Sequence, residues 1–440
     1  MRARWFAVLA VVALAATACG NSSSGKSSKN TTTTSAGSSG TVKGGGTFPA
    51  VNQPGVTPTE IRVSGVASVT NPLGGLYGAA FDGVQAYFNM VNSEGGIYGR
   101  KLVLVKRHDD QLSNNQREVE AIIDQDNAFA VLPVATIFSF SGANLLAKND
   151  IPTFGWGIND EWTGPPNFFG HVGALCNGAD CPGPTLPWVA QKLGKKKVAV
   201  LAYNVANSAD CADGVKASFD KYNTGPKLVF VDKSLSFGVT DVSADVHRMV
   251  DTKTDLVVPC MDENGALTLA REMRQQGVEA TKYLVNGYDH EFMAKNAGFF
   301  EGAIVSVQEA PLETRPAFAT LREFIKWMDK DGFRKSENAE VGWVNATQFV
   351  TGLQQAGASF TQQKVIAAIN RETAFDAGGM IPPINWTQQH TDIHYPLGCG
   401  APVKVHDGKF ATVFTPPGKP FQCIVGTPAT LEAAKIEYRQ

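Results

Sequence analysis

Two short runs of this sequence carry residue types that could do chemistry. In His390-Thr-Asp392-Ile-His394 the three polar side chains alternate, so on a strand they would share one face and could bind a metal ion with a fourth ligand or a water. The run His108-Asp109-Asp110 places a histidine beside two carboxylates. Neither run completes a known catalytic motif, and the sequence contains no GxSxG elbow and no HExxH pair. We therefore predict a protein that is not an enzyme, with a metal-dependent hydrolase as a remote alternative.

A third run, Gly20 to Ser27, fits the phosphate-binding pattern GxxxxGK[ST] letter for letter. That pattern binds phosphate only where a strand precedes it and a helix follows it, because the backbone amides must converge on the anion. Here an apolar leader precedes the run and a Ser/Thr-rich stretch follows it. The context argues against a nucleotide site, and we predict no cofactor.

The leader itself predicts export. Arg2 and Arg4 precede an apolar run, and small residues lead to Cys19, which is the layout of a secretory signal peptide over residues 1–18. The run is too short to span a membrane. Ala-Thr-Ala before Cys19 resembles a bacterial lipobox, so we predict lipidation of Cys19 and a lipid-anchored protein on the extracytoplasmic face of the cell membrane. A secreted protein in which Cys19 has no such role is the alternative.

Residues 19–57 are rich in Ser, Thr, Gly and Asn, which predicts a disordered tether between the anchor and the folded part. The remainder of the 440-residue chain is too long for one hydrophobic core and suggests two lobes. Hydrophobic residues make up 43% of the sequence and the formal net charge is −2, so no basic excess points to nucleic acid.

Six cysteines follow Cys19, and an even number in an exported chain favours disulfides. Six cysteines allow fifteen pairings. Cys176 and Cys181 bracket a short glycine-containing turn, and Cys399 and Cys423 flank a predicted hairpin around Asp407-Gly408. These two pairs leave Cys211 with Cys260, each just past a predicted strand. A zinc site is the rival interpretation, but no CxxC or HxxxH spacing supports it.

From residue 59 onward, short apolar runs alternate with segments of helical periodicity. Two series of strands and helices are predicted. The first series has strands at 60–67, 101–107, 128–134 and 151–154, and helices after residue 76 and at 139–149. The second has strands at 198–203, 227–231, 255–258 and 283–286, and helices near 210–222, 241–251 and 263–276.

Alternating strands and helices predict parallel sheets covered by helices on both faces. Two such series predict an α/β protein with two doubly wound, Rossmann-like lobes. Ligands of such sheets bind beyond the carboxyl ends of the strands, so the natural site is the cleft between the lobes.

Several segments are similar to branched-chain amino acid binding proteins. The most specific is the glycine spacing from Gly78 through Gly83, Gly95 and Gly96 to Gly99, and Asp109-Asp110, 151–154 and 384–386 also fit. The resemblance implies the type I periplasmic-binding fold, in which crossover strands join the lobes, and an ABC importer permease as partner. It also favours a structural or cleft-edge role for His108-Asp109-Asp110.

Under this resemblance we predict lobe 1 at residues 58–180 and 302–382 and lobe 2 at 181–301 and 383–440. Hinges are expected near 170–195, 300–310 and 380–395. A monomer that opens and closes about these hinges around its ligand is the expected mechanism.

The resemblance implies ligand contacts from the first lobe. Thr136 and Ser139 lie where a strand gives way to a helix, and the family binds a ligand carboxylate on this segment; an ordinary helix N-cap is the alternative. Trp156, Gly157 and Asn159 follow the next strand. Tyr77 occupies the position of a cleft tyrosine, and its alternative is a residue of an amphipathic helix start.

In the second lobe, the predicted ligand contacts again follow strands. Tyr203 and Asn207 come after one strand, Asp262 after the next, and Tyr288 with Asp289 after a third. Asp262 or Asp289 could hold an ammonium group through a charge-assisted hydrogen bond. Because both precede predicted helices, helix capping explains them equally well.

Two departures from the family bear on the ligand. Ile137, Phe138 and Phe140 interrupt the hydroxyl-rich segment, and Asn286-Gly287 replaces the acidic residue expected to hold an ammonium. Both argue against an α-amino acid, and amides, urea-like compounds and organic acids remain open. The sequence therefore predicts a receptor of an ABC importer for a small polar molecule, an amino acid, an amide or a related compound. A ligand-sensing lipoprotein acting through a membrane partner is the alternative.

Overall fold

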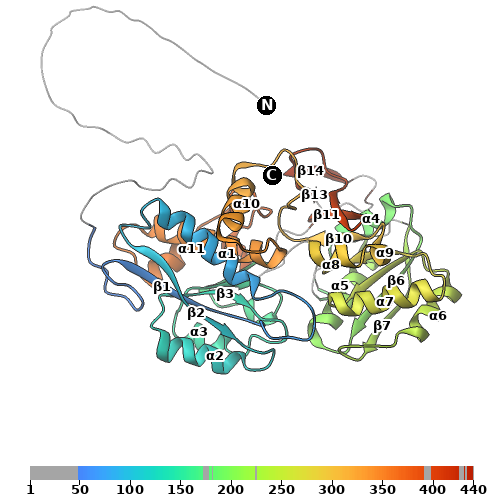
Figure 1. The fold of residues 1–440 in the computed structure, drawn as a ribbon, viewed down its shortest axis with the longest axis horizontal. Helices are drawn as coiled ribbons and strands as arrows, with labels where there is room; N and C mark the ends of the chain where they lie inside the picture. Colours follow the sequence, from blue (N-terminus) through green and yellow to red (C-terminus); the bar gives the residue numbers. More distant parts are fainter. Residues whose placement is uncertain are drawn as a thin grey trace, which may run out of the picture. The chain divides into compact units, whose positions relative to one another are not determined.

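Two sheets, one parallel and one mixed, form the framework of the protein (Figure 1). The computed structural model describes residues 48–171, 178–180, 182–222, 225–390, 398–425, 431 and 434–439. All of them belong to one structural unit. The first sheet has five strands in the order β2-β1-β3-β4-β5, and the second has nine, with β12 pairing β11 beside the path β14-β13-β11-β10-β9-β8-β6-β7. Within the described residues, no helix has the length and apolarity needed to cross a membrane.

The first sheet is entirely parallel and its strands alternate with helices, as the sequence predicts. Its elements are β1 (Glu60–Ala67), α1 (Ala79–Ser93), β2 (Lys101–Asp109), α2 (Asn115–Ala121), the π-helix η1 (Ile122–Asp126), β3 (Ala130–Ala135), α3 (Ala143–Lys148), β4 (Thr153–Trp156), the 3₁₀-helix η2 (Asp160–Trp162) and β5 (Phe168–His171).

Both faces of this sheet are covered, which explains why all six residues of β3 are buried and apolar. On one face Val63 and Phe154 pack into the core that α1 and α11 close, whereas on the other Val66 and Val131 pack with residues of α2 and α3. The helices α2 and α3 lie together below the sheet in Figure 1, away from α1 and α11.

The second sheet is parallel from β7 to β10. Its elements and their helices are α4 (Thr185–Lys192), β6 (Lys197–Tyr203), α5 (Ala206–Lys221), β7 (Lys227–Leu235), α6 (Ser243–Thr252), β8 (Leu256–Cys260), α7 (Glu263–Gln275), β9 (Thr281–Leu284), α8 (His290–Lys295), α9 (Ala297–Phe300) and β10 (Ile304–Val307).

Strand β6 shows how the sequence encodes a layer covered on both sides. Val198 and Val200 pack with α4 and α5, while Ala199 and Leu201 pack with α6 and α7, because successive side chains of a strand point to opposite faces. A continuous apolar run therefore forms a buried central strand. The two doubly wound α/β layers that the sequence predicts are confirmed.

The remaining helices return to the first sheet, where α11 packs against α1, β3 and β4 (Figure 1). They are α10 (Ala319–Asp331), α11 (Glu337–Ala356), α12 (Gln362–Ile369) and α13 (Trp386–Gln389).

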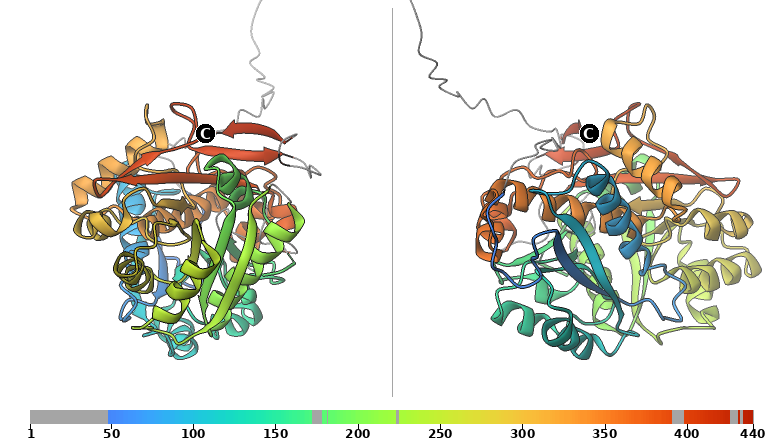
Figure 2. Two further views of the ribbon diagram at one scale, coloured as in Figure 1. Left: turned by 90° about the vertical axis from the view of Figure 1, so that its right-hand side faces the viewer. Right: turned by 60° about the vertical axis from the view of Figure 1, so that its left-hand side comes forward.

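The C-terminal strands extend the second sheet in the antiparallel sense, and Figure 2 shows them as a long ribbon at one edge of the molecule. They are β11 (Cys399–His406), β12 (Lys409–Thr412), β13 (Phe421–Val425) and β14 (Lys435–Arg439). The predicted turn at Asp407-Gly408 joins β11 to β12.

Two of the predicted disulfides are confirmed. Cys399 and Cys423 are direct partners across β11 and β13 and are bonded, and Cys211 on α5 is bonded to Cys260 at the end of β8. The predicted Cys176–Cys181 pair lies outside the described residues, as do Asp392 and His394 of the possible metal run. The signal peptide, Cys19 and the Gly20–Ser27 run also lie outside them.

The last ten residues of the predicted tether belong to the folded part. Phe48 packs edge-on against Tyr98 with ring centroids 5.6 Å apart, and the guanidinium of Arg100 donates to the carbonyl of Pro49 at 2.9 Å. Val51 and Val56 pack against the main core. The predicted boundary at residue 57 is therefore wrong, because the apolar residues after 47 bury themselves despite a polar composition overall.

Candidate ligand site between the sheets

A cavity lies where the carboxyl ends of the strands of both sheets meet, at the place that the doubly wound pattern predicts. It encloses about 900 Å³ of space outside the protein atoms, including its opening to solvent. We call it the main cavity. Its lining residues are Leu73, Tyr77, Ile137, Phe138, Trp156, Ile158, Tyr203, Val205, Asn207, Ser208, Cys211, Phe237, Cys260, Met261, Asp262, Val285, Asn286, Ser306 and Gln308.

The first sheet contributes an aromatic wall. Tyr77, just before α1, and Trp156, the last residue of β4, stack with ring centroids 6.2 Å apart. The indole N–H of Trp156 donates to Oε1 of Gln308 at 2.7 Å, which fixes the ring. Burial, aided by the charges of Asp262 and Glu263, raises the pKa of Tyr77, so its hydroxyl stays protonated and can donate a hydrogen bond.

The second sheet contributes a polar corner. The hydroxyl of Tyr203 donates to Oδ2 of Asp262 at 2.7 Å, while Oδ1 of Asp262 caps α7 by accepting from the backbone N–H groups of Asn264 and Gly265. Burial and this carboxylate raise the pKa of Tyr203. Asp262 therefore caps α7, and because it also lines the main cavity, its contact with a ligand stays a prediction.

Three contacts around the main cavity join segments that follow strands of the first sheet to segments that follow strands of the second, among them the starts of α5 and α7. Nδ2 of Asn207 donates to the carbonyl of Ile137 at 2.5 Å, and Nδ2 of Asn264 donates to the carbonyl of Pro72 at 3.2 Å. The rings of Phe138 and Phe237 meet edge-on at 4.9 Å. These contacts hold the two sides of the cavity together.

A second cavity adjoins the first and shares Tyr77, Trp156 and Asn286 with it. Two further predicted residues, Tyr288 and Asp289, line this second cavity. Its lining residues are Gly75, Leu76, Tyr77, Trp156, Glu263, Asn286, Gly287, Tyr288, Asp289, Ser336, Glu337, Asn338 and Val341.

Four predicted contacts line neither cavity. Thr136 is buried and donates to the carbonyl of Ser139 at 3.3 Å, and Ser139 itself is exposed and donates to Glu161. Gly157 packs against the backbone of Gly170, and Asn159 is buried with no hydrogen-bond partner for its side chain among the described residues. The helix that follows this segment is α3, which begins only at Ala143. Their role in ligand binding stays a prediction without support from the cavity geometry.

The sequence reasoning missed several lining residues. Phe237 comes from the turn after β7, and Ser306 with Gln308 comes from the end of β10, where no local motif marks them. Ile137 and Phe138, which depart from the family pattern, turn out to supply the wall where hydroxyls are expected.

The other sequence runs have structural roles. His108 is buried between Glu118 and Asp126, 2.8 Å from each carboxylate, and it ties β2 to α2 and η1. Asp110 accepts from the hydroxyl of Ser68 at 2.8 Å. The ring of His390 contacts Oδ1 of Asn370 at 2.5 Å.

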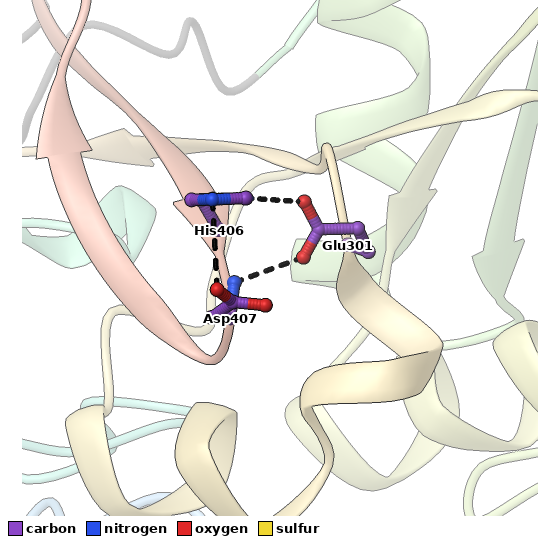
Figure 3. Close-up of side chains that lie close together, drawn as sticks. All are labelled: Glu301, His406 and Asp407. Carbon is purple, nitrogen blue, oxygen red and sulfur yellow. Dashed lines mark hydrogen bonds and ion pairs between the residues drawn. The ribbon is translucent and has the colours of Figure 1, made fainter.

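Among the described residues, the geometry brings one group together that could hold a metal: Glu301, His406 and Asp407 (Figure 3). All three are exposed. Both oxygens of Glu301 already interact, one with Nδ1 of His406 at 2.8 Å and the other with the backbone N–H of Asp407 at 2.9 Å. The group joins the β11–β12 turn to the end of α9, so we assign it a structural role.

The fold and the sequence agree with one family. A model described as "Periplasmic binding protein" matches residues 60–409, and a comparison with curated proteins finds no match.

Three similar solved structures are named by their ligands or transporters. A fatty acid ABC transporter substrate-binding protein from Thermomonospora curvata is 19% identical, with a TM-score of 0.66 over 82% of this chain and 94% of its own. The branched-chain amino acid transporter substrate-binding protein of Streptococcus pneumoniae, in complex with isoleucine, is 16% identical with a TM-score of 0.66 over 80% and 99%. An ABC transporter solute-binding protein from R. palustris, in complex with benzoate, is 16% identical with a TM-score of 0.62 over 80% and 95%.

Identities this low establish the fold alone, but the family match covers most of the chain. The protein therefore belongs to the periplasmic binding protein family, a family of solute-binding proteins.

Proposed function

We propose that this protein is the extracytoplasmic receptor of an ABC importer and holds one small molecule in the main cavity. The observation that carries the proposal is the cavity itself: strand ends of two separate sheets converge on it, and each sheet supplies hydrogen-bonding groups. A concave, mostly apolar site with few, well-placed polar groups is typical of small-molecule binding. The similar structures bind or transport fatty acid, isoleucine and benzoate, respectively.

The lining bears on the proposed ligand class. Most of it is apolar or aromatic, and no lysine or arginine is among its residues. Thr136 and Ser139, on which the family would place a carboxylate, lie outside it. Within the predicted class of amino acids, amides and related compounds, we therefore favour a ligand with a substantial apolar body and few hydrogen-bonding groups.

The proposed mechanism is closure of the two sides around the ligand. The contacts of Asn207 with Ile137 and of Asn264 with Pro72 cross the cavity and would break on opening. A ligand that touches both sides shifts the population toward the closed form, which the importer permease would recognise. The predicted lobe boundaries and hinges remain part of this proposal, and β10, inside the predicted 300–310 hinge, is a strand of the second sheet.

The proposed location rests on the sequence alone. A signal peptide over residues 1–18 and a lipid on Cys19 would hold the receptor, as a monomer, at the outer face of the membrane next to its permease.

A thermal-shift screen tests the proposal. The purified protein is heated with amino acids, amides, organic acids, amines and sugars, and a ligand at a hundred times its Kd should stabilise the fold by about 2.7 kcal/mol. Scattering with the best compound should then show a more compact molecule. Silence of the whole panel, or an unchanged scattering profile with a saturating ligand, would count against a closing receptor.

A further inference from the structure

The second cavity differs from the main cavity in its charge. Carboxylates come to it from three elements: Glu263 from the start of α7, Asp289 from the N-cap of α8 and Glu337 from the start of α11. Tyr77 and Trp156 line both cavities, so the two form adjoining compartments of one site. One ligand can therefore place an apolar part in the main cavity and a polar part in the second.

Glu263 is the residue that the fold itself does not explain. It is 9% exposed, it lines the second cavity, and its carboxylate has no hydrogen-bond partner among the described residues. Helix capping does not require it, since Asp262 already caps α7. Burying a carboxylate without a partner is costly, so such a group is expected to serve a ligand.

Among the described residues, few cations act on this region. The charge of Arg334 acts on Glu263, but the guanidinium of Arg334 is bound to Asp289 and also contacts Oε2 of Glu291 at 3.0 Å. Neither cavity is lined by a lysine or an arginine. The carboxylate of Glu337 accepts a hydrogen bond from the backbone N–H of Gln308 at 2.8 Å. The carboxyl of Glu340, one turn further along α11, has no hydrogen bond to any described residue.

The raised pKa values of Glu263 and Glu337 are consistent with a site that lacks a neutralising positive charge. Burial raises the pKa of Glu263 to about 8, the charges of Asp289, Asp262 and Glu337 contribute in the same direction, and Arg334 opposes them. Burial likewise raises the pKa of Glu337 well above its usual range. A bound cation would reverse these shifts and restore the ionised carboxylates.

We propose that the second cavity is a subsite for a cationic group, an ammonium or amidinium, on a ligand whose apolar body fills the main cavity. The proposal rests on the proposed receptor function and adds to it the charge of the substrate. Glu263 is the principal anion, and Glu337 and Asp289 supply the surrounding negative field.

The subsite does not copy the acidic position that the family resemblance leads one to expect, because Asn286-Gly287 occupies that place. A carboxylate on the neighbouring helix start, Glu263, reaches the same compartment from the adjacent strand end. The sequence alone does not show that Glu263 can replace the missing acidic residue, because the segments that follow β8 and β9 become neighbours only in the folded protein.

The test uses probes that share an apolar body and differ in charge. 2-Phenylethylamine and hexylamine are compared with the corresponding alcohols and carboxylic acids, by calorimetry on the purified protein. The amines should bind at least tenfold more tightly than their partners. The affinity of the amines should rise by up to about 50-fold from pH 6 to pH 8, since a cation binds the ionised form of a carboxyl whose pKa is about 8.

Glu263→Gln separates charge from hydrogen bonding. The amide keeps a donor and an acceptor but no charge, so amine binding should fall at least tenfold and lose its rise with pH. Glu279→Gln is the matched control, because Glu279 is an exposed carboxylate in the loop between α7 and β9 that lines neither cavity. It should bind the amines as the unaltered protein does.

Three results would overturn the proposal: alcohols or acids that bind as well as the amines, amine binding that Glu263→Gln leaves unchanged, or no amine binding at all. Each of these leaves the receptor function standing if another compound class binds in the broader screen. Only a thermal-shift screen in which no compound stabilises the protein would contradict both the receptor function and the cationic subsite.

Discussion

Replacing Gly342 by alanine is expected to lower the free energy of unfolding by about 3 kcal/mol or more. Gly342 lies on α11 where this helix crosses α1, and a Cβ there would lie 1.9 Å from the backbone carbonyl oxygen of Ala80. The opposing Gly83 on α1 makes an equally close contact, since a Cβ there would lie 1.8 Å from the carbonyl oxygen of Ala339. Backbone cannot yield as a flexible side chain can, so the two helices would have to separate along a buried core.

Denaturant unfolding checks this expectation. Gly298→Ala is the matched control, because Gly298 is also helical but its Cβ would meet only the end of the Arg274 side chain, at 3.1 Å. That change should stay within about 1 kcal/mol of the unaltered protein. A Gly342→Ala protein as stable as the Gly298→Ala protein would mean that the close crossing of α1 and α11 is not present in solution.

The second large effect is a loss of stability with rising pH. Burial raises the pKa of Glu263 and of Glu309 to about 8, against an ordinary value of 4.5, so the folded state prefers these carboxyls protonated. For an acid with a raised folded-state pKa, stability is lost as the pH rises from the unfolded pKa to the folded one. Of the interval from pH 6 to pH 9, the two pH units below the folded-state pKa of about 8 lower the stability, for each of the two carboxyls. One pH unit corresponds to about 1.4 kcal/mol for each carboxyl. Together the two should lower the free energy of unfolding by about 5 kcal/mol.

His171 sets the lower end of the pH window. It lies 3.0 Å from Oε1 of Glu309, and burial lowers its pKa to about 4, so folding loses stability on the acid side as the pH falls from 6.5 toward 4. Unfolding by denaturant at pH 6, 7.5 and 9 measures the alkaline arm. The double change Glu263→Gln with Glu309→Gln should make that arm shallower, whereas Glu279→Gln should not; the remaining slope comes from Glu337 and Glu340, whose pKa burial also raises. A profile that is flat or rises toward pH 9 would contradict the burial of unpaired carboxyls.

Much of the fold follows from sequence patterns that are local. The apolar runs of β3 and β6 identify central strands, because both faces of each are covered by helices. The same logic places Tyr77, Trp156, Tyr203, Asn207 and Asp262 at one cavity, since carboxyl ends of parallel strands share one edge of a sheet.

The predicted contacts that do not line the cavity also have physical reasons. Ser139 points to solvent and Thr136 turns back on the chain, so Ile137 and Phe138 line the cavity in their place. Strand ends can be predicted from composition, but the direction of each side chain in the loop that follows depends on packing. Phe237 and Gln308 join the site only through tertiary contacts, which no local motif reveals.

The acidic subsite is the clearest example of a feature that the sequence alone does not predict. Glu263 and Glu337 are separated by more than seventy residues, and each alone is an ordinary acidic residue in the first turn of a helix, favoured there by the helix dipole. What distinguishes them is their place on one cavity that no lysine or arginine lines, with Glu263 buried and Glu337 half-buried.

The central claim, that a small molecule binds between the two sheets, is tested most directly by titrating the best compound of the thermal-shift screen into two variants by calorimetry. Phe237 is half-buried in a turn and lines the main cavity, whereas Phe299 is half-buried on α9 and lines neither cavity. The account predicts one-to-one binding that weakens about tenfold or more in Phe237→Ala and is unchanged in Phe299→Ala. Equal binding by both variants, or a titration that never saturates, would contradict it.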